Sequence, residues 1–200
     1  GLETAFEAGV VERSARTRAR RGYGLDAGKM EVVKTVQTSR MGFICSNGIL
    51  ELGEWIVTSH DDGKVEVWEQ QGWTLVKTFQ TGQHEVRAMA ECGGMLVTGG
   101  EDGSIKLWQQ GTWTCVRTLE GHTDDVRDLV VHGDWLLSCS YDNTVRVWDR
   151  TSWECLRVVQ TGHRGGVISL AVHDGKLYCG GNGAEPTIRV IDTTTWASVG

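Results

Sequence analysis

The sequence has a single proline, and no apolar run approaches the roughly 18 residues that a membrane span needs. It begins Gly-Leu-Glu-Thr, without the basic and apolar regions of a secretory signal, and a start without Met favours a fragment or a processed chain. Basic residues are also in deficit, since 20 Lys and Arg against 26 Asp and Glu give a formal charge of −6. This balance argues against nucleic acid or a membrane as the principal partner. The sequence therefore predicts a soluble cytoplasmic or nuclear protein.

The six cysteines lack the spacing of a metal site or a redox motif, because no Cys-x-x-Cys occurs. Cys115 and Cys155 are 40 residues apart, which places them in different structural units rather than around one ion. We expect buried free thiols in a reducing compartment, and neither a metal nor a cofactor. His60, His132 and His173 lie in or beside turn sequences and are interpreted as solvated turn residues.

Glycine and tryptophan are abundant, with 27 Gly and nine Trp, and the tryptophans fall at three phases of one repeat. Successive members are 40 residues apart in two series, one at 68, 108 and 148 and one at 73, 113 and 153. Trp196 follows 43 residues after the second series, and Trp55 and Trp135 differ by 80 with Met95 midway between them. A fixed period of about 40 residues indicates a repeat architecture.

Each repeat reads as four short strands separated by turns. Residues 126–159 contain four segments rich in β-branched and aromatic residues, and Gly, Asp and Asn occupy the breaks between them. No segment has the periodicity of a helix. The predicted fold class is therefore all-β, built from four-stranded antiparallel sheets.

The order Gly121-His122, Ser138, Asp142, Trp148-Asp149 resembles the WD-repeat family, and Gly162-His163 opens a further unit. The resemblance implies a β-propeller whose four-stranded blades surround a central channel. It covers residues from about 31 to 200, with departures such as Gly82-Gln83-His84, where the histidine is displaced. The blades are expected at about 38–80, 81–120, 121–160 and 161–200.

The resemblance also implies a hydrogen-bonded tetrad in each blade, made by a histidine, a hydroxyl, an aspartate and a tryptophan. In the third unit these are His122, Ser138, Asp142 and Trp148. The other expected members are Thr98, Asp102 and Trp108 in the second unit, and Thr58, Asp62 and Trp68 in the first. Ser, His and Asp are also the components of a hydrolytic triad, but repetition of the set in several units favours a structural role.

The last unit and the N-terminal region depart from the repeat. Cys179, Glu185 and Ile191 stand where Ser138, Asp142 and Trp148 stand earlier, so we expect this blade to lack the tetrad. Residues 1–30 are predicted to form a disordered arm with five Arg at 13–21, and residues 31–37 an extra fourth strand. About four blades are present, and a larger ring, completed by missing blades or by another chain, is expected.

The resemblance implies a non-catalytic scaffold that binds a peptide segment of a partner protein on its loops. One form of this role is the substrate-recruiting part of a signalling or ubiquitin-ligase protein. From their positions in the repeat, we expect the binding face to include Arg87, Arg127 and Tyr141 as anchors, together with Glu85, Asp125, Glu101 and Asp61. An acidic or phosphorylated ligand is expected, although each arginine has acidic neighbours that would make it an ordinary surface pair. The alternatives are a structural subunit of a large assembly and a propeller hydrolase.

Overall fold

The computed structural model describes residues 44–183 and 187–199, all of which belong to the unit formed by Val36–Gly200. These residues form strands β1 to β15 and contain no helix. They accordingly include no helical segment of the length and hydropathy required to cross a membrane. The arm predicted at 1–30 and the strand predicted at 31–37 lie outside the described residues.

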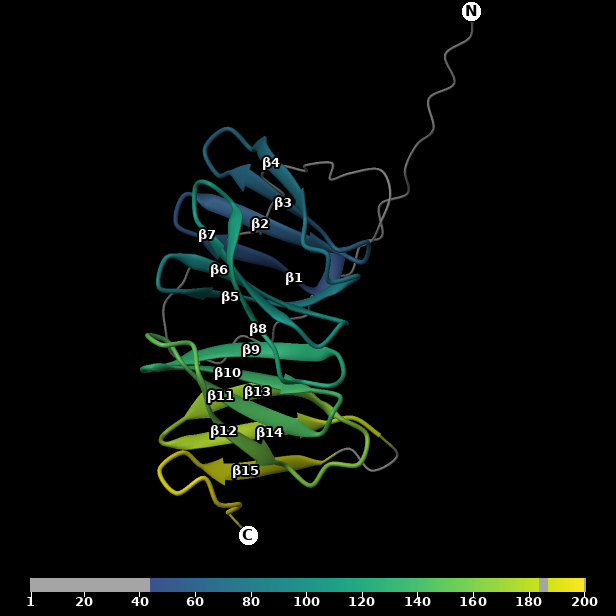
Figure 1. Cartoon of the computed structure of the whole chain (residues 1–200), viewed down its shortest axis with the longest axis vertical. Coiled ribbons are helices and arrows are strands. Elements are labelled where there is room, and N and C mark those ends of the chain that lie inside the picture. The colour runs from purple at the N-terminus through teal and green to yellow at the C-terminus, as the bar shows by residue number, and fades with distance from the viewer. Residues whose placement is uncertain (1–43, 184–186, 200) are drawn as a thin grey trace, which may run out of the picture. The chain divides into compact units, whose positions relative to one another are not determined.

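The strands form four antiparallel sheets, which we call blades 1 to 4 (Figure 1). Blade 1 consists of β1 (Ile44–Leu52), β2 (Trp55–His60), β3 (Lys64–Glu69) and β4 (Thr74–Gln80). Blade 2 consists of β5 (Val86–Cys92), β6 (Met95–Gly100), β7 (Ile105–Gln109) and β8 (Thr114–Leu119). Blade 3 consists of β9 (Val126–His132), β10 (Trp135–Ser140), β11 (Thr144–Asp149) and β12 (Cys155–Gln160). Blade 4 consists of β13 (Val167–His173), β14 (Lys176–Gly181) and β15 (Ile188–Asp192).

Strands within each blade pair in chain order, and the all-β, four-stranded antiparallel prediction is confirmed. In blade 4, the residues after β15 continue the same pattern: Ile191 forms a bridge with Ser198, and the Val199 amide donates to the Val190 carbonyl at 2.8 Å. This register matches that of Trp148 with Cys155 in blade 3. The last described residues therefore occupy the position in blade 4 that corresponds to the start of β4, β8 and β12 in the other blades.

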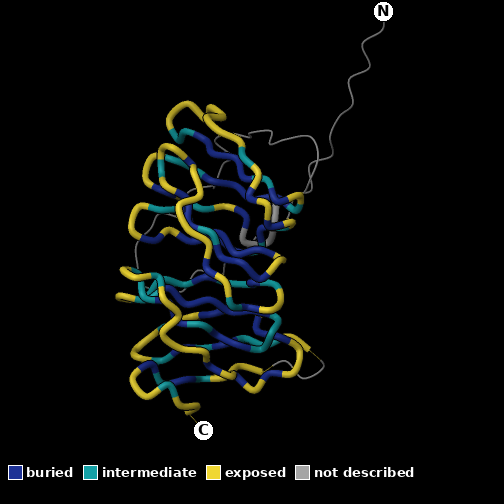
Figure 2. The backbone as a smooth tube through the Cα atoms, viewed as in Figure 1, coloured by how far each residue is buried: buried dark blue, intermediate teal, exposed yellow. Residues whose placement is uncertain are grey.

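Burial differs sharply between the inner and outer strands of a blade (Figure 2). Most residues of β6 and β10 are buried, whereas nearly all of β4, β8 and β12 are exposed. The expectation that the cysteines are buried is therefore wrong for Cys115 and Cys155, which lie on exposed outer strands. Cys92, Cys139 and Cys179 are buried free thiols.

The hydrophobic core lies between neighbouring blades rather than within one. Blade 2 contributes Ala88, Ile105 and Leu107 to a cluster that also contains Val126 and Leu136 of blade 3. Equivalent clusters join blade 1 to blade 2 and blade 3 to blade 4. Burying a Val, Leu or Ile side chain fully stabilises a fold by about 1.5 to 3 kcal/mol, so each blade depends on its neighbours for most of its stability.

The tryptophans in the turns between the third and fourth strands also join adjacent blades. Trp113 and Trp196 have the left-handed φ values 55° and 59°, a conformation that disfavours bulky residues. Trp113 makes an edge-to-face contact with Trp55 at a centroid distance of 6.3 Å, and Trp196 contacts Trp135 at 5.4 Å. Such aromatic pairs add about 0.5 to 1.5 kcal/mol beyond the burial of their area, which helps to offset the cost of the backbone conformation.

Candidate functional site

Blade 3 contains a complete hydrogen-bonded chain across its inner strands. The Trp148 indole N–H donates to Ser138 Oγ at 2.9 Å, and Ser138 Oγ lies 2.7 Å from His122 Nε2. On the other side of the ring, His122 Nδ1 lies 2.8 Å from Asp142 Oδ2. We call these four side chains the blade 3 fastener.

The carboxylate of Asp142 fixes the direction of its hydrogen bond with the histidine. A carboxylate only accepts hydrogen bonds, so His122 Nδ1–H donates to Asp142. Burial alone would raise the pKa of Asp142, but hydrogen bonds from His122 and Thr144 outweigh it and hold that pKa well below its usual range. Asp142 is therefore an anion that holds the turn between β10 and β11 against the loop entering the blade.

Blade 2 has the same network with glutamine in the place of histidine. Thr98 Oγ1 donates to Gln83 Oε1 at 2.5 Å and accepts from the Trp108 indole at 2.9 Å. Gln83 Nε2 donates to the Ser104 hydroxyl, which in turn donates to Asp102 Oδ1 at 2.8 Å. The predicted members Thr98, Asp102 and Trp108 thus belong to one network, and Gln83 and Ser104 link them.

In blade 1 the predicted members Thr58, Asp62 and Trp68 do not come together among the described residues. Thr58 Oγ1 lies 3.2 Å from Nε2 of His60, which also faces Glu66 at 3.4 Å. Among the described residues, Asp62 binds Lys64, through the backbone amide and the ammonium group of that lysine. His60 is fully buried, so its interpretation as a solvated turn residue is wrong. Its side chain lies against the neighbouring strand β3, where Glu66 replaces the cation found in blades 2 and 3.

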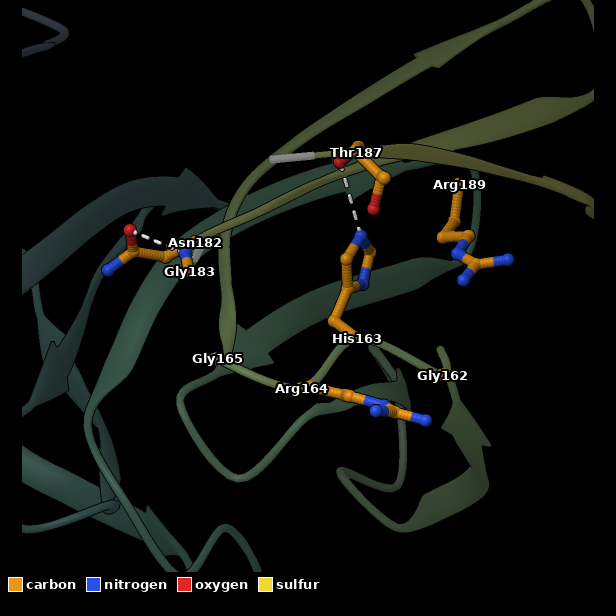
Figure 3. Close-up of a pocket in the computed structure, with 8 residues that line it drawn as sticks. All are labelled: Gly162, His163, Arg164, Gly165, Asn182, Gly183, Thr187 and Arg189. Atoms are coloured by element: carbon orange, nitrogen blue, oxygen red, sulfur yellow. Dashed lines mark hydrogen bonds between the residues drawn. The ribbon is translucent and has the colours of Figure 1, made fainter. Parts of the chain in front are cut away.

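Blade 4 has a histidine but no complete fastener in the described residues. His163 Nδ1 lies 2.8 Å from Thr161 Oγ1, and Nε2 lies 3.3 Å from the Thr187 carbonyl (Figure 3). Cys179 is buried, and this burial raises the pKa of its thiol to about 12. Glu185 lies outside the described residues.

The predicted binding residues of blades 2 and 3 form a continuous row of charges. Arg87 makes an ion pair with Glu85, and its Nε lies 3.6 Å from Asp125 Oδ2. Asp125 also faces Arg127, whose Nη1 lies 3.7 Å away. Burial, which outweighs the attraction of Arg87, raises the pKa of Asp125. The two arginines thus reach one surface and share one carboxylate.

Tyr141 extends this row toward blade 4. The guanidinium of Arg127 lies 4.8 Å from the centre of the Tyr141 ring. Gly166, in the loop that enters blade 4, also packs against the tyrosine: it has φ +91°, and a Cβ there would lie 2.3 Å from Tyr141 Cδ1. Glu101 is exposed and donates its amide to the Glu85 carbonyl, while Asp61 lies in the corresponding turn of blade 1. We call Glu85, Arg87, Asp125, Arg127 and Tyr141 the loop-face row.

The spacing of the fasteners agrees with a known repeat. The family model described as "WD domain, G-beta repeat" matches residues 73–109 and 113–149, each running from a turn tryptophan to the residue after the fastener tryptophan. Residues 73–109 and 113–149 are therefore two WD40 repeats. No curated protein matches the sequence of the chain.

Solved structures give the same fold for the WD40 repeats. A chain in the "Crystal Structure of Mitotic Checkpoint Complex" is 24% identical with a TM-score of 0.67, over 74% of this chain and 48% of that one. The "Structure of U3-55K" is 19% identical with a TM-score of 0.72, over 82% and 52%. The "computationally designed Ika4 protein" is 25% identical with a TM-score of 0.69, over 81% and 98%. The chain therefore spans about half the length of the first and second of these proteins.

The geometry of the blade 3 fastener argues against a hydrolase. Ser138 has no exposed surface, and the His122 side chain is likewise fully buried. A nucleophile must reach its substrate, and this hydroxyl is already held between an indole and an imidazole. The same network recurs around Thr98 without a histidine. WD40 propellers are generally non-catalytic, and this arrangement provides structural stability.

The sequence pattern missed several residues that hold the site together. Gln83 could have been found by aligning the residue after Gly82 with His122, whereas the visible His84 is exposed. Gly166 is required by the position of the Tyr141 ring, which no spacing reveals. The described residues contain no group of three or more His, Cys, Asp or Glu able to hold a metal ion.

Proposed function

We propose that this WD40-repeat chain is a non-catalytic interaction scaffold that binds a segment of a partner protein along the loop-face row. The observation that carries the proposal is the continuity of the row, in which Arg87, Asp125, Arg127 and Tyr141 interact in sequence across adjacent blades. Arg and Tyr are the residue types that most often dominate binding energy at interfaces. Both arginines remain accessible, with 28% and 19% of their side chains exposed.

The charges of the row restrict the kind of segment that would bind. Glu85 and Asp125 already neutralise the two guanidinium groups, so an acidic or phosphorylated ligand must displace one of these carboxylates. The raised pKa of Asp125 favours its displacement, because burial makes its charged form costly. We therefore propose a segment with one acidic or phosphorylated side chain placed between Arg87 and Arg127, and an apolar neighbour against Tyr141.

Replacement of both arginines tests this proposal. The variant Arg87→Ala/Arg127→Ala should lose partners that the unchanged chain captures, while its melting temperature stays nearly the same because partly exposed ion pairs contribute only about 0 to 1 kcal/mol. The matched control is Lys77→Ala/Lys176→Ala, which removes two positive charges from β4 and β14. Equal capture of the same partners by both double variants would show that the loop-face row is not the binding site.

A further inference from the structure

Asp125 lies at the centre of the loop-face row, between the two arginines that the proposed ligand would contact. One of its carboxylate oxygens, Oδ2, lies 3.6 Å from Arg87 Nε and 3.7 Å from Arg127 Nη1. Glu85, the other carboxylate of the row, forms an ion pair with Arg87 and with no other described arginine. Asp125 is therefore the described carboxylate whose neutralisation would release both guanidinium groups at once.

The Asp125 carboxylate attracts the two arginines by charge but does not satisfy their hydrogen-bonding groups. Both of its contacts with them are longer than the roughly 2.7 to 2.9 Å of a charge-assisted hydrogen bond. Nε of Arg87 and Nε of Arg127 are buried, and neither has a hydrogen-bond partner within the described part of the chain. Because a buried donor without a partner costs free energy, an anion that replaces this carboxylate gains hydrogen bonds that Asp125 does not make.

The surroundings of Asp125 make its negative charge costly. Its side chain is only 14% exposed, and burial is the largest cause of the rise in its pKa. Asp124 in the same loop and Glu101 in the turn after β6 are like charges that raise the pKa further. Arg87 on β5 and Arg127 on β9 lower it, but they do not outweigh the rise. The Asp125 carboxyl group therefore takes up a proton at a higher pH than an exposed aspartate does.

We infer that Asp125 is an internal competitor for the anionic group of the ligand, and that protonation of its carboxyl group makes the loop-face row available to that anion. While Asp125 is charged, it and Glu85 neutralise the two guanidinium groups, so an anion is attracted weakly. Once Asp125 is neutral, one positive charge is uncompensated, and both guanidinium groups can form charge-assisted hydrogen bonds with a ligand. The inference rests on the function proposed above, and it adds which carboxylate restricts binding and how pH regulates it.

Titration of the isotope-labelled chain with sodium sulfate at constant ionic strength, followed by NMR, tests the inference. Sulfate is the probe because, unlike a phosphoryl group, it does not titrate near neutral pH. We expect saturable shifts of the Nε–H signals of Arg87 and Arg127. Asp125→Asn should bind sulfate about fivefold more tightly than the unchanged chain at pH 7, because the competing ion pairs are lost. Asp125→Ala, a second neutral variant, should show the same increase, and circular dichroism verifies that both are folded.

Glu101→Gln is the matched control for the loss of one negative charge. Glu101 acts on Asp125 through its charge, but it forms no ion pair with Arg87 or Arg127 in the described structure. Its replacement should change the sulfate affinity less than about twofold, because solvent screens exposed charges. An affinity equal in the unchanged chain and both Asp125 variants, or an equally large effect of Glu101→Gln, would overturn the inference. An absence of saturable shifts at the two arginines of Asp125→Asn would overturn it as well.

The difference between the unchanged chain and Asp125→Asn should shrink as the pH is lowered from 7 to about 5, because protonation then neutralises Asp125 in the unchanged chain. The other titratable neighbours are the exposed His84, which adjoins Glu85, and the Tyr141 ring on Arg127. Both are present in the two proteins, so the ratio of the two sulfate affinities isolates the effect of Asp125. A ratio that stays constant over this range would contradict control by the proton.

Thermodynamic linkage requires the converse effect, in which bound sulfate raises the pKa of Asp125. The signal of its carboxyl carbon, followed against pH with and without saturating sulfate, measures this change, and an unchanged pKa would refute the competition. The result is distinguishable from that of the capture experiment above. Partners that are lost in Arg87→Ala/Arg127→Ala but captured equally by Asp125→Asn and the unchanged chain would support the scaffold and refute the competitor. Capture that does not depend on the arginines would refute the binding site itself.

Discussion

Trp148 and Asp142 lie at the two ends of a buried hydrogen-bonded network in which each member bonds to the next, and Asp142 also accepts hydrogen bonds from Thr123 and Thr144. A buried polar group that loses its partner costs about 1 to 3 kcal/mol, whereas a paired one contributes much less. The network therefore stabilises the blade mainly because its loss would leave several groups unpaired at once. Because neither Ser138 nor His122 faces solvent, each needs a hydrogen-bond partner within the protein, and each provides one for the other.

Trp148→Phe should destabilise the protein by about 1 to 3 kcal/mol, because the buried Ser138 hydroxyl loses the indole N–H that donates to it. The free energy of unfolding, measured by urea denaturation, gives the effect. Trp73→Phe is the control, since Trp73 is 39% exposed and lies outside the fastener. Equal losses in the two variants would show that the indole hydrogen bond contributes nothing beyond the change of ring.

Asp142 should make stability depend on acid pH. Its pKa in the folded state lies below the value of about 3.9 for an unfolded chain, so its contribution is fully present above that value and is lost as the pH falls toward the folded-state pKa. Asp142→Asn should thus be less stable than the unchanged chain at pH 7. The difference in the free energy of unfolding between the two proteins should narrow below about pH 4.

Urea denaturation at a series of pH values checks this, with Asp134→Asn at an exposed position as the control. A gap between Asp142→Asn and the unchanged chain that stays constant from pH 7 down to about pH 3 would contradict the role of the Asp142 charge.

At the residue level, the sequence predicted the fastener of blade 3 but not its variants. Hydroxyl, carboxylate and indole recur at fixed spacing, so their proximity follows from the strand register. Gln83 replaces His122 because an amide also offers one donor and one acceptor, and residue type alone does not reveal that equivalence. The burial of His60 with Glu66 has no counterpart among the described residues of the other blades, so no repeat pattern could indicate it.

At the level of strands and blades, the position of a strand in its sheet determines how exposed its residues are, which the sequence periodicity alone does not indicate. Most residues of β6 and β10 are buried, whereas nearly all residues of β8 and β12 are exposed, so Cys115 and Cys155 are exposed despite their apolar neighbours. The sequence showed that the turn tryptophans recur at one position of the repeat. Their contacts with Trp55 and Trp135 of the preceding blade emerged only in three dimensions.

Blade 4 should exchange its backbone amide hydrogens faster than blade 3. Cys179 and Ile191 replace the hydroxyl and indole of the fastener, and the described pairing beyond β15 is limited to the residues around Ser198. Hydrogen–deuterium exchange with mass spectrometry should show lower protection for β13–β15 than for β9–β12. Equal protection of the two blades would mean that packing between blades, rather than the fastener, determines local stability.

At the scale of the whole molecule, stability is shared between neighbours and binding is presented by the loops. Each core cluster belongs to two blades, so the four blades support one another and keep the loop-face row in a fixed arrangement. The match covers about half the length of two of the similar solved chains, whereas it covers 98% of the length of Ika4. A larger ring, completed by further blades or by another chain, stays a prediction.

The most direct test of the proposed scaffold is site-specific photocrosslinking from the loop-face row. A photoreactive phenylalanine analogue at Tyr141 should crosslink a partner protein, and Arg87→Ala/Arg127→Ala in the same chain should abolish that crosslink. The control carries the analogue at Val116, which is 53% exposed on the outer strand β8, and should give no crosslink to that partner. A crosslink of equal yield from position 116, or one from position 141 that survives the loss of both arginines, would contradict the account.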